Sequence, residues 1–182
     1  MNVFFLDRNP VCAAQCQCDK HVVKMVTETA QMLSAVHHFA YTELKGSNKI
    51  YRLAYAKHPW TKWAFWSRLH YRWLLAHGIA LGQEYTYRYG KIHKSAEVIE
   101  GIAEWSDENK FWRVTSVDGG SIKWVPYCVR TEDEYITYAG GRIRRDPVEA
   151  YRSYYKYKNT IMDMRWTKRE PPPWFTEIHL AA

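Results

Sequence analysis

Apolar residues recur every three or four positions between residues 19 and 38, which is the period of an amphipathic helix. At about 100° per residue, one side of this helix collects a set of small and branched apolar side chains, namely Val22, Val23, Val26, Ala30 and Leu33. The other side carries His21, Lys24 and Glu28 within about 60° of one another. The pattern predicts a helix that packs through its apolar side and presents a base, an amine and an acid on the other.

Asp19 stands at the start of this helix, where its carboxylate is expected to be the N-cap and to accept amide hydrogens of the first turn. Two interpretations of the polar side stay open. Lys24 and Glu28 are four residues apart, a spacing typical of a solvated surface pair that contributes only about 0.2–0.5 kcal/mol. His21, directly after the cap, favours instead a chemical role for the row of three side chains.

A second long helix is predicted over residues 60–90. Pro59 suits its start, the stretch contains no proline, and Gly90 is a suitable C-terminal stop. Apolar and aromatic residues cover most sides of this stretch, so it is expected to be the central helix of the domain. A shorter helix is predicted to begin at Pro10 and to end near Cys18.

The later part of the chain alternates between helical and irregular patterns. A helix is expected over residues 95–105, and another begins at Asp146 with Pro147 in its first turn. Between them, glycine-rich turns flank a short apolar run, residues 122–125, that predicts a strand. The fold class predicted for the chain is therefore mainly α, a single compact helical domain over residues 1–182 with a short irregular or β segment around residues 110–145.

Composition adds a partner class to this picture. The chain of 182 residues has a formal net charge of +7 and is 16% aromatic, with 14 Tyr and 9 Trp. A basic, aromatic-rich protein favours a polyanion such as DNA or RNA over a membrane or an acidic protein. No apolar run approaches the roughly 20 residues of a membrane span, and the first residues do not resemble a signal peptide. A cytoplasmic location is expected.

Three cysteines lie close together and, with His21, form the pattern C-x3-C-x-C-x2-H, which comprises Cys12, Cys16, Cys18 and His21. Zinc sites usually consist of two well-separated pairs, so this spacing is a poor match to one. Small cysteines one helical turn apart commonly pack as apolar side chains. The sequence therefore predicts neither a metal site nor a cofactor. No P-loop, dinucleotide fingerprint, nucleophile-elbow or H-E-x-x-H motif occurs.

Cations interleave with aromatic residues in the last third of the chain, and the proline-rich end is expected to be a stiff tail. Cations neutralise phosphates, and aromatic faces can stack on bases. The predicted nucleic-acid-binding residues, including basic side chains nearer the N-terminus, are Lys20, Arg68, Arg88, Arg142, Arg144, Arg145, Arg152, Tyr155, Trp166, Lys168 and Arg169. The alternative stays open that tyrosines at helical spacing are core residues beside solvated cations.

Residues 15–35 resemble the pyrimidine-dimer DNA glycosylase/AP lyase family of the phage endonuclease V type. Asp19-Lys20-His21 looks like the Asp-x-His at the start of that family's first long helix, and Glu28 falls at the spacing of its catalytic glutamate. The whole chain resembles small phage proteins that share Cys-Asp-Lys-His-Val-Val-Lys-Met, Arg-Tyr-Gly-Lys and Trp-Thr-Lys-Arg blocks.

This resemblance implies a DNA-acting enzyme in which an amine attacks C1′ of a sugar to form an imine while Glu28 stabilises the sugar cation and moves protons. The family uses the α-amine exposed by removal of the first methionine, whereas Asn2 usually leaves Met1 in place. The α-amine of Met1 and the amine of Lys24 are the two candidate nucleophiles, and His21 belongs to the same site. Two other functions stay open: a nucleic-acid-binding protein without catalysis, and a transferase that modifies DNA bases or nucleotides.

Overall fold

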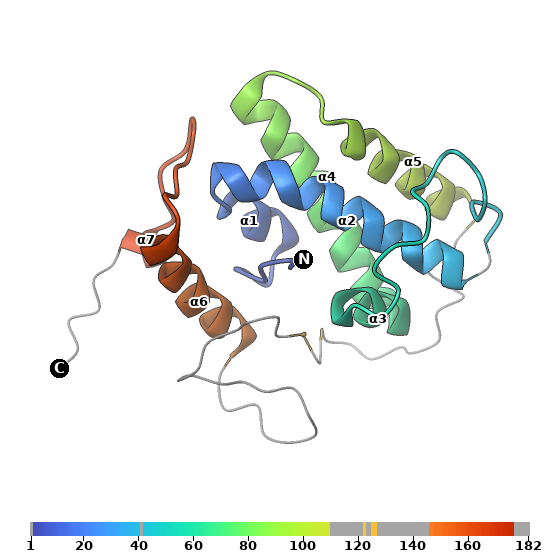
Figure 1. The fold of residues 1–182 in the computed structure, drawn as a ribbon, viewed down its shortest axis with the longest axis horizontal. Coiled ribbons are helices and arrows are strands. Elements are labelled where there is room, and N and C mark those ends of the chain that lie inside the picture. Colours follow the sequence, from blue (N-terminus) through green and yellow to red (C-terminus); the bar gives the residue numbers. More distant parts are fainter. Residues whose placement is uncertain (1, 41, 110–121, 123–124, 127–145, 177–182) are drawn as a thin grey trace.

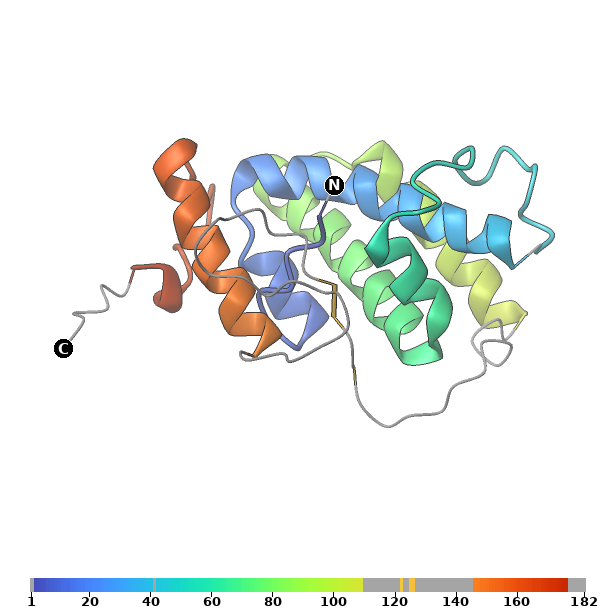
Figure 2. The ribbon, with the colours of Figure 1, turned by 60° about the horizontal axis from the view of Figure 1, so that its bottom comes forward.

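Two long helices form the centre of the computed structural model, which describes residues 2–40, 42–109, 122, 125–126 and 146–176. The helices are, in chain order, α1 (Pro10–Gln15), α2 (Asp19–Phe39), α3 (Pro59–Trp66), α4 (Arg68–Tyr89), α5 (Lys94–Glu108), α6 (Pro147–Ile161) and α7 (Pro173–Thr176). α2 and α4 pack together, α5 lies against both, and α1 packs on α4 (Figure 1). α6 and α7 lie together on the other side of α2 and α4 from α5 (Figure 2). The prediction of a mainly α fold is confirmed.

One apolar core joins these helices to the start of the chain. Residues 3–6 are buried beneath α2, and α4 contributes Tyr71, Leu74 and Leu81 to the same cluster. α6 joins it through Tyr151 and Tyr155, both fully buried. Across the described residues, no helix is long and apolar enough to cross a membrane. Most of the segment predicted to be irregular or β, around residues 110–145, lies outside the described residues.

Local sequence accounts for several helix ends. The side chain of Asn9 accepts hydrogen bonds from the first turn of α1, and the Asp146 carboxylate accepts one from Val148 N at 2.8 Å at the start of α6. Gly90 ends α4 in the left-handed conformation, with φ of 66°. The predicted starts at Pro10 and Pro147 and the predicted stop at Gly90 are confirmed.

The predicted helix over residues 60–90 is wrong in one respect, because it is two helices separated at Ser67. Ser67 has an extended backbone, and its hydroxyl accepts a hydrogen bond from Leu69 N at 3.2 Å, so it caps α4. The carbonyl of Trp63, at the end of α3, accepts a bond from His70 Nδ1 at 3.0 Å, and the two rings stack with their centroids 4.2 Å apart. Side chains thus replace the backbone bonds that a continuous helix would make.

Two predictions about α2 are also wrong. Cys18 is its N-cap residue, while Asp19 is already helical and directs its carboxylate to Thr167 and Arg88. Val23 is 42% exposed, since the buried side of α2 extends from Val22 toward His21 rather than toward Val23. Tertiary contacts of the Asp19 carboxylate and of His21 therefore decide where α2 is capped and which of its sides is buried.

Two glycines allow α4 to approach its neighbours closely. A Cβ at Gly78 would lie 2.8 Å from Thr29 Cγ2 of α2, and one at Gly82 would lie 2.7 Å from Ala96 Cβ of α5. Ala96 Cβ is attached directly to the backbone and cannot rotate away, so the helices themselves would have to move.

We therefore expect Gly82→Ala to lower the free energy of unfolding by about 1–3 kcal/mol, as overpacking in a core does. Gly101→Ala is the matched control, because Gly101 lies within α5 with no atom within 4 Å of its added Cβ. That variant should be stabilised by about 0.5–1 kcal/mol through helix propensity. Urea unfolding measures both changes, and equal effects of the two substitutions would contradict the close approach of α4 and α5.

Candidate functional site

The start of the chain lies across the polar side of α2 and runs antiparallel to it. The backbone N–H of Asn2 donates to Glu28 Oε2 at 3.0 Å, and the Phe4 ring lies against the His21 ring with centroids 4.3 Å apart. Glu28 is therefore only 8% exposed and His21 only 6%. Residues 2–6 cover a side of the helix that would otherwise be solvated.

Glu28 is the centre of a small polar site at this junction. Its Oε2 accepts the Asn2 N–H, and its Oε1 lies 3.3 Å from Nζ of Lys24, one helical turn earlier. The side chain of Lys24 is 66% exposed, so this amine reaches solvent while the carboxylate beneath it is largely covered. The site thus combines a covered acid, an accessible amine and the backbone nitrogen of residue 2.

His21 is held in place by α6. Its Nδ1 lies 2.7 Å from the hydroxyl of Tyr155, which also accepts the backbone N–H of Cys18 at 2.8 Å. The Tyr155 hydroxyl oxygen accepts the hydrogen bond from Cys18, so the hydroxyl proton can be donated to Nδ1 of His21. The ring proton of the neutral His21 is then on Nε2. Burial, reinforced by the charges of Lys158, Lys24 and Lys20, lowers the pKa of His21 to about 3. His21 is thus a neutral link between α2 and α6.

Three lysines surround the covered side chains. Lys20 and Lys24 project from α2 and are exposed, and Lys158 of α6 lies 5.9 Å from the Phe4 ring centroid and 5.6 Å from that of Tyr154. Lys20 has no ion-pair partner among the described residues, and Lys158 has none either. These charges make the approach to the site attractive to an anion.

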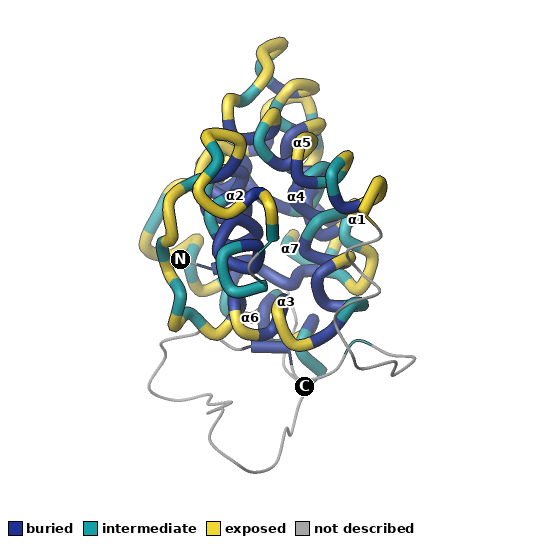
Figure 3. The backbone as a smooth tube through the Cα atoms, turned by 90° about the vertical axis from the view of Figure 1, so that its right-hand side faces the viewer, coloured by how far each residue is buried: buried dark blue, intermediate teal, exposed yellow. Residues whose placement is uncertain are grey.

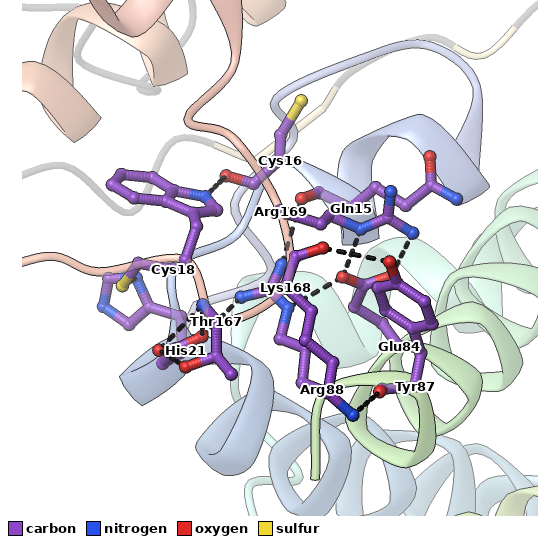
Figure 4. A network of polar contacts seen from close by, with 12 residues as sticks. Gln15, Cys16, Cys18, His21, Glu84, Tyr87, Arg88, Thr167, Lys168 and Arg169 are labelled. Atoms are coloured by element: carbon purple, nitrogen blue, oxygen red, sulfur yellow. Dashed lines mark hydrogen bonds and ion pairs between the residues drawn. The ribbon is translucent and has the colours of Figure 1, made fainter. Parts of the chain in front are cut away.

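Several of the predicted nucleic-acid contacts have partners within the protein itself. Arg88 is 2% exposed and its guanidinium contacts Glu84 Oε1 at 2.7 Å and Asp19 Oδ1 at 2.8 Å. Arg169 binds both oxygens of the same Glu84 (Figure 4). Thr167 donates to the Asp19 carboxylate from its backbone nitrogen and its hydroxyl. This network, named here the arginine clamp, ties the segment 165–169 to α2 and α4.

The electrostatics of the clamp follow from these partners. Burial alone would raise the pKa of Asp19, but the hydrogen bonds from Thr167 and the charge of Arg88 lower it overall. The hydrogen bond to Glu84 raises the pKa of Arg169. The charges of Arg88 and Arg169 are therefore neutralised within the protein and are committed to holding the C-terminal segment.

Three more of the predicted nucleic-acid contacts also form hydrogen bonds within the protein. Trp166 donates its indole N–H to the Cys16 carbonyl at 3.0 Å, and Lys168 donates to the Tyr87 carbonyl at 3.1 Å. Arg152 donates to the Leu6 carbonyl at 2.9 Å and to Asp7 at 3.2 Å, which ties residues 6 and 7 to α6. Tyr155 is buried, so the alternative that some tyrosines are core residues applies to it.

Other predicted residues are less constrained or lie outside the description. Lys20 is exposed, and Arg68 is partly buried at the start of α4. Met1 and the three arginines Arg142, Arg144 and Arg145 lie outside the described residues. Sequence reasoning missed Asn2, Phe4 and Lys158, because only the folding of residues 2–6 between α2 and α6 brings them to Glu28 and His21.

The three cysteines that the structure describes do not gather into a metal centre. Cys12 is exposed, Cys16 is partly buried and Cys18 is buried, with Cys18 Sγ 3.4 Å from His21 Nδ1. Within the described part of the chain, no group of three or more His, Cys, Asp or Glu side chains is placed to hold a metal ion. Comparisons of this chain with protein-family models, with curated proteins and with solved structures found no match.

Three buried histidines should make stability depend on pH. Burial lowers the pKa of His21 to about 3, and those of His37 and His77 to about 4. In the unfolded chain the histidine pKa values are near 6.5. Between about pH 4 and 6.5 the unfolded chain therefore binds more protons than the folded protein, so the free energy of unfolding should fall as pH drops below about 6.5.

Urea unfolding at several pH values between 7.5 and 4.5 checks this expectation, and histidine proton resonances identify the groups. We expect the three ring resonances to keep their neutral positions down to pH 5 while stability declines. A free energy of unfolding that stays constant over this range would contradict the burial of neutral imidazoles.

Proposed function

We propose that this protein is a DNA-acting enzyme of the glycosylase/AP lyase type, which forms an imine between an amine of the chain and C1′ of a deoxyribose. One observation carries the proposal: the largely covered carboxylate of Glu28 holds the backbone nitrogen of Asn2 at 3.0 Å. In a chain that begins with Met1, the α-amine is one peptide unit from this nitrogen. The resemblance of residues 15–35 to the endonuclease V type supports the same chemistry.

The reaction needs an amine and an acid side by side, because imine chemistry depends strongly on proximity. The amine nitrogen attacks C1′, the bond between C1′ and the base breaks, and the departing base leaves with that electron pair and takes up a proton. The attached nitrogen then gives up its protons and forms a double bond to C1′, while the bond between C1′ and the ring oxygen O4′ breaks and that oxygen takes up a proton. At a site that has already lost its base, the amine adds to the C1′ aldehyde and water is lost. Glu28 is suited to stabilising the positive charge on the sugar and to accepting a proton from the attacking amine.

Two amines remain in competition for the role of nucleophile. The α-amine is favoured by the position of Asn2 and by the reference pKa of such amines, which is about 7.7–8.0 against about 10.4 for lysine. Lys24 is favoured by its own contact with Glu28, 3.3 Å from Nζ to Oε1, and by its exposure.

The other side chains around Glu28 have supporting roles in this proposal. Lys20, Lys24 and Lys158 would attract the phosphates of the substrate. His21 is a positioning residue, since it is neutral and bonded to Tyr155, and it supports Phe4 by ring contact. Phe4 itself has φ of 54°, an uncommon conformation for a non-glycine residue that often occurs near functional sites.

Borohydride trapping tests the proposal directly. The protein is incubated with an oligonucleotide that contains an abasic site, and borohydride reduces the imine at C1′ to a stable secondary amine that links protein and DNA. We expect a covalent product, and peptide mass spectrometry should locate it on the α-amine or on Lys24. Reductive methylation limited to the α-amine should abolish the product in the first case, and Lys24→Ala should do so in the second.

The outcomes separate the competing functions. A folded protein that binds abasic and ultraviolet-damaged DNA but yields no adduct would contradict the lyase proposal and favour the binding protein. Transfer of a chemical group to intact bases without any adduct would favour the transferase.

A further inference from the structure

The charge of this protein is concentrated in one part of the chain. No Asp or Glu occurs between Glu43 and Glu84, whereas the same stretch contains seven cations, namely Lys45, Lys49, Arg52, Lys57, Lys62, Arg68 and Arg72. This number equals the formal net charge of the whole chain, +7. The stretch comprises the loop after α2, α3 and most of α4.

Most of these cations lie at the surface with no acid to neutralise them. Lys49, Arg52, Lys57, Lys62 and Arg72 are exposed and form no ion pair with any residue that the structure describes. α5 has the opposite character and exposes Glu97, Glu100, Glu104, Asp107 and Glu108. Because α2 and α4 lie between α3 and α5, the two charges occupy different sides of the molecule (Figure 3). A phosphate backbone would therefore approach from the α3 side.

Aromatic rings are exposed among the same cations. In α3, Lys62, Phe65 and Trp66 are spaced i, i+3 and i+4 and project on one side, while Trp60 and Trp63 fill the buried side. Phe65 is 41% exposed and Trp66 57%, and Tyr55 in the preceding loop is 49% exposed. Exposed rings beside unpaired cations have the composition of a surface that stacks bases and neutralises phosphates.

Hydrogen bonds tie the segment that leads into this surface to α2 and α5. The backbone N–H of Tyr51 donates to Ser34 Oγ of α2 at 3.1 Å, and the Tyr51 hydroxyl lies 3.0 Å from Ser95 Oγ. The same Ser95 hydroxyl lies 2.9 Å from Thr27 Oγ1, on the residue before Glu28. The chain therefore crosses the side of α2 that carries Thr27 and Ser34 before it continues through Arg52 and Tyr55 to α3.

We propose that the α3 surface, defined as Lys49, Arg52, Tyr55, Lys57, Lys62, Phe65, Trp66 and Arg72, binds single-stranded DNA. Stacking on exposed rings requires bases whose faces are free, which a duplex does not offer. α3 is also only 8 residues long and ends in two aromatic residues, which does not suit reading of a major groove. The proposal goes beyond the chemistry at Glu28, because binding here requires no reaction.

The contribution of the cations to binding is tested by fluorescence anisotropy. The probes are a labelled single-stranded 30-nucleotide DNA and a duplex of the same sequence. Lys57→Gln combined with Lys62→Gln should weaken single-strand binding about tenfold and reduce the slope of log K against log salt by roughly 1.4, since each lost phosphate contact contributes about 0.7. Lys91→Gln combined with Lys94→Gln is the matched control. Both lysines are exposed at the start of the acidic α5, and replacing them removes the same amount of positive charge. That pair should change affinity less than twofold.

Trp66→Ala tests the stacking part and should weaken single-strand binding about tenfold while leaving duplex binding nearly unchanged. Ile92→Ala, at another exposed apolar side chain, is its control and should have no effect. Circular dichroism verifies that all variants are folded. Equal losses in the test and control lysine pairs, tighter binding of the duplex, or binding of anionic lipid vesicles in place of DNA would each overturn the proposal. Normal single-strand binding without borohydride trapping would contradict only the proposed reaction.

Discussion

Glu28→Gln is expected to reduce borohydride trapping on abasic DNA by at least about 100-fold, within the range typical of removing a catalytic acid or base. Glutamine has nearly the same size as glutamate, and its amide oxygen can still accept the Asn2 N–H that lies 3.0 Å from Glu28 Oε2. The start of the chain should therefore stay in place. The lost feature is the negative charge that would stabilise the sugar cation and accept a proton.

Glu97→Gln is the matched control, because it removes the same charge from an exposed position on α5. We expect its trapping rate to equal that of the wild type. Single-turnover trapping and DNA anisotropy should be measured together, and the affinity of Glu28→Gln for abasic DNA should be unchanged or slightly higher. Trapping by Glu28→Gln at the wild-type rate would show that the acid has no part in imine formation.

Glu84→Gln should destabilise the protein by about 3–5 kcal/mol, since it removes the shared counter-charge of the arginine clamp. The side chain of Arg88 has an exposed fraction of 0%, and Glu84 has 3%. In this variant Arg88 would keep only Asp19 as an acidic partner. Arg169 would lose its charged partner, because both of its hydrogen bonds are to the Glu84 carboxylate. A buried charge without its partner costs far more than the intact pair contributes.

Asp163→Asn is the control for this prediction. The Asp163–Arg165 pair has a comparable distance of 2.7 Å, but its side chains are 63% and 80% exposed, so the change should stay below about 0.5 kcal/mol. Thermal and urea unfolding measure both variants. Limited proteolysis of Glu84→Gln should also cut first within the segment 165–169, which the clamp holds. A loss below about 1 kcal/mol in Glu84→Gln would contradict the structural role of the clamp.

The arginine clamp also changes which residues are available to a ligand. Arg88, Arg169, Trp166 and Lys168 were predicted from sequence as DNA contacts, yet each has a partner within the protein. Among the residues that the structure describes, exposed cations with no ion-pair partner lie elsewhere, including Lys20 of α2 and the five cations of the α3 surface. Charge and composition alone could not separate these two groups, because a buried arginine and an exposed one contribute equally to a net charge.

The sequence by itself determined the helices, because their signals are local. Apolar periodicity, proline in the first turn and glycine in the left-handed conformation at Gly90 all act within a few residues. The same reasoning brought His21, Lys24 and Glu28 to one side of α2, since a helix fixes which residues are neighbours. Even so, the break at Ser67 was missed, because the apolar pattern continues through it while a side-chain cap ends the helical bonding.

Only the tertiary structure decided which of these side chains are covered and what they bind. Asn2 reaches Glu28 across 26 positions of sequence, Tyr155 reaches His21 across 134, and Thr167 reaches Asp19 across 148. Those contacts bury the acid and the histidine and divert Asp19 from the expected cap. Local patterns cannot encode them, because the free energy that favours each contact comes from desolvation and pairing of groups that become neighbours only when the whole chain has folded.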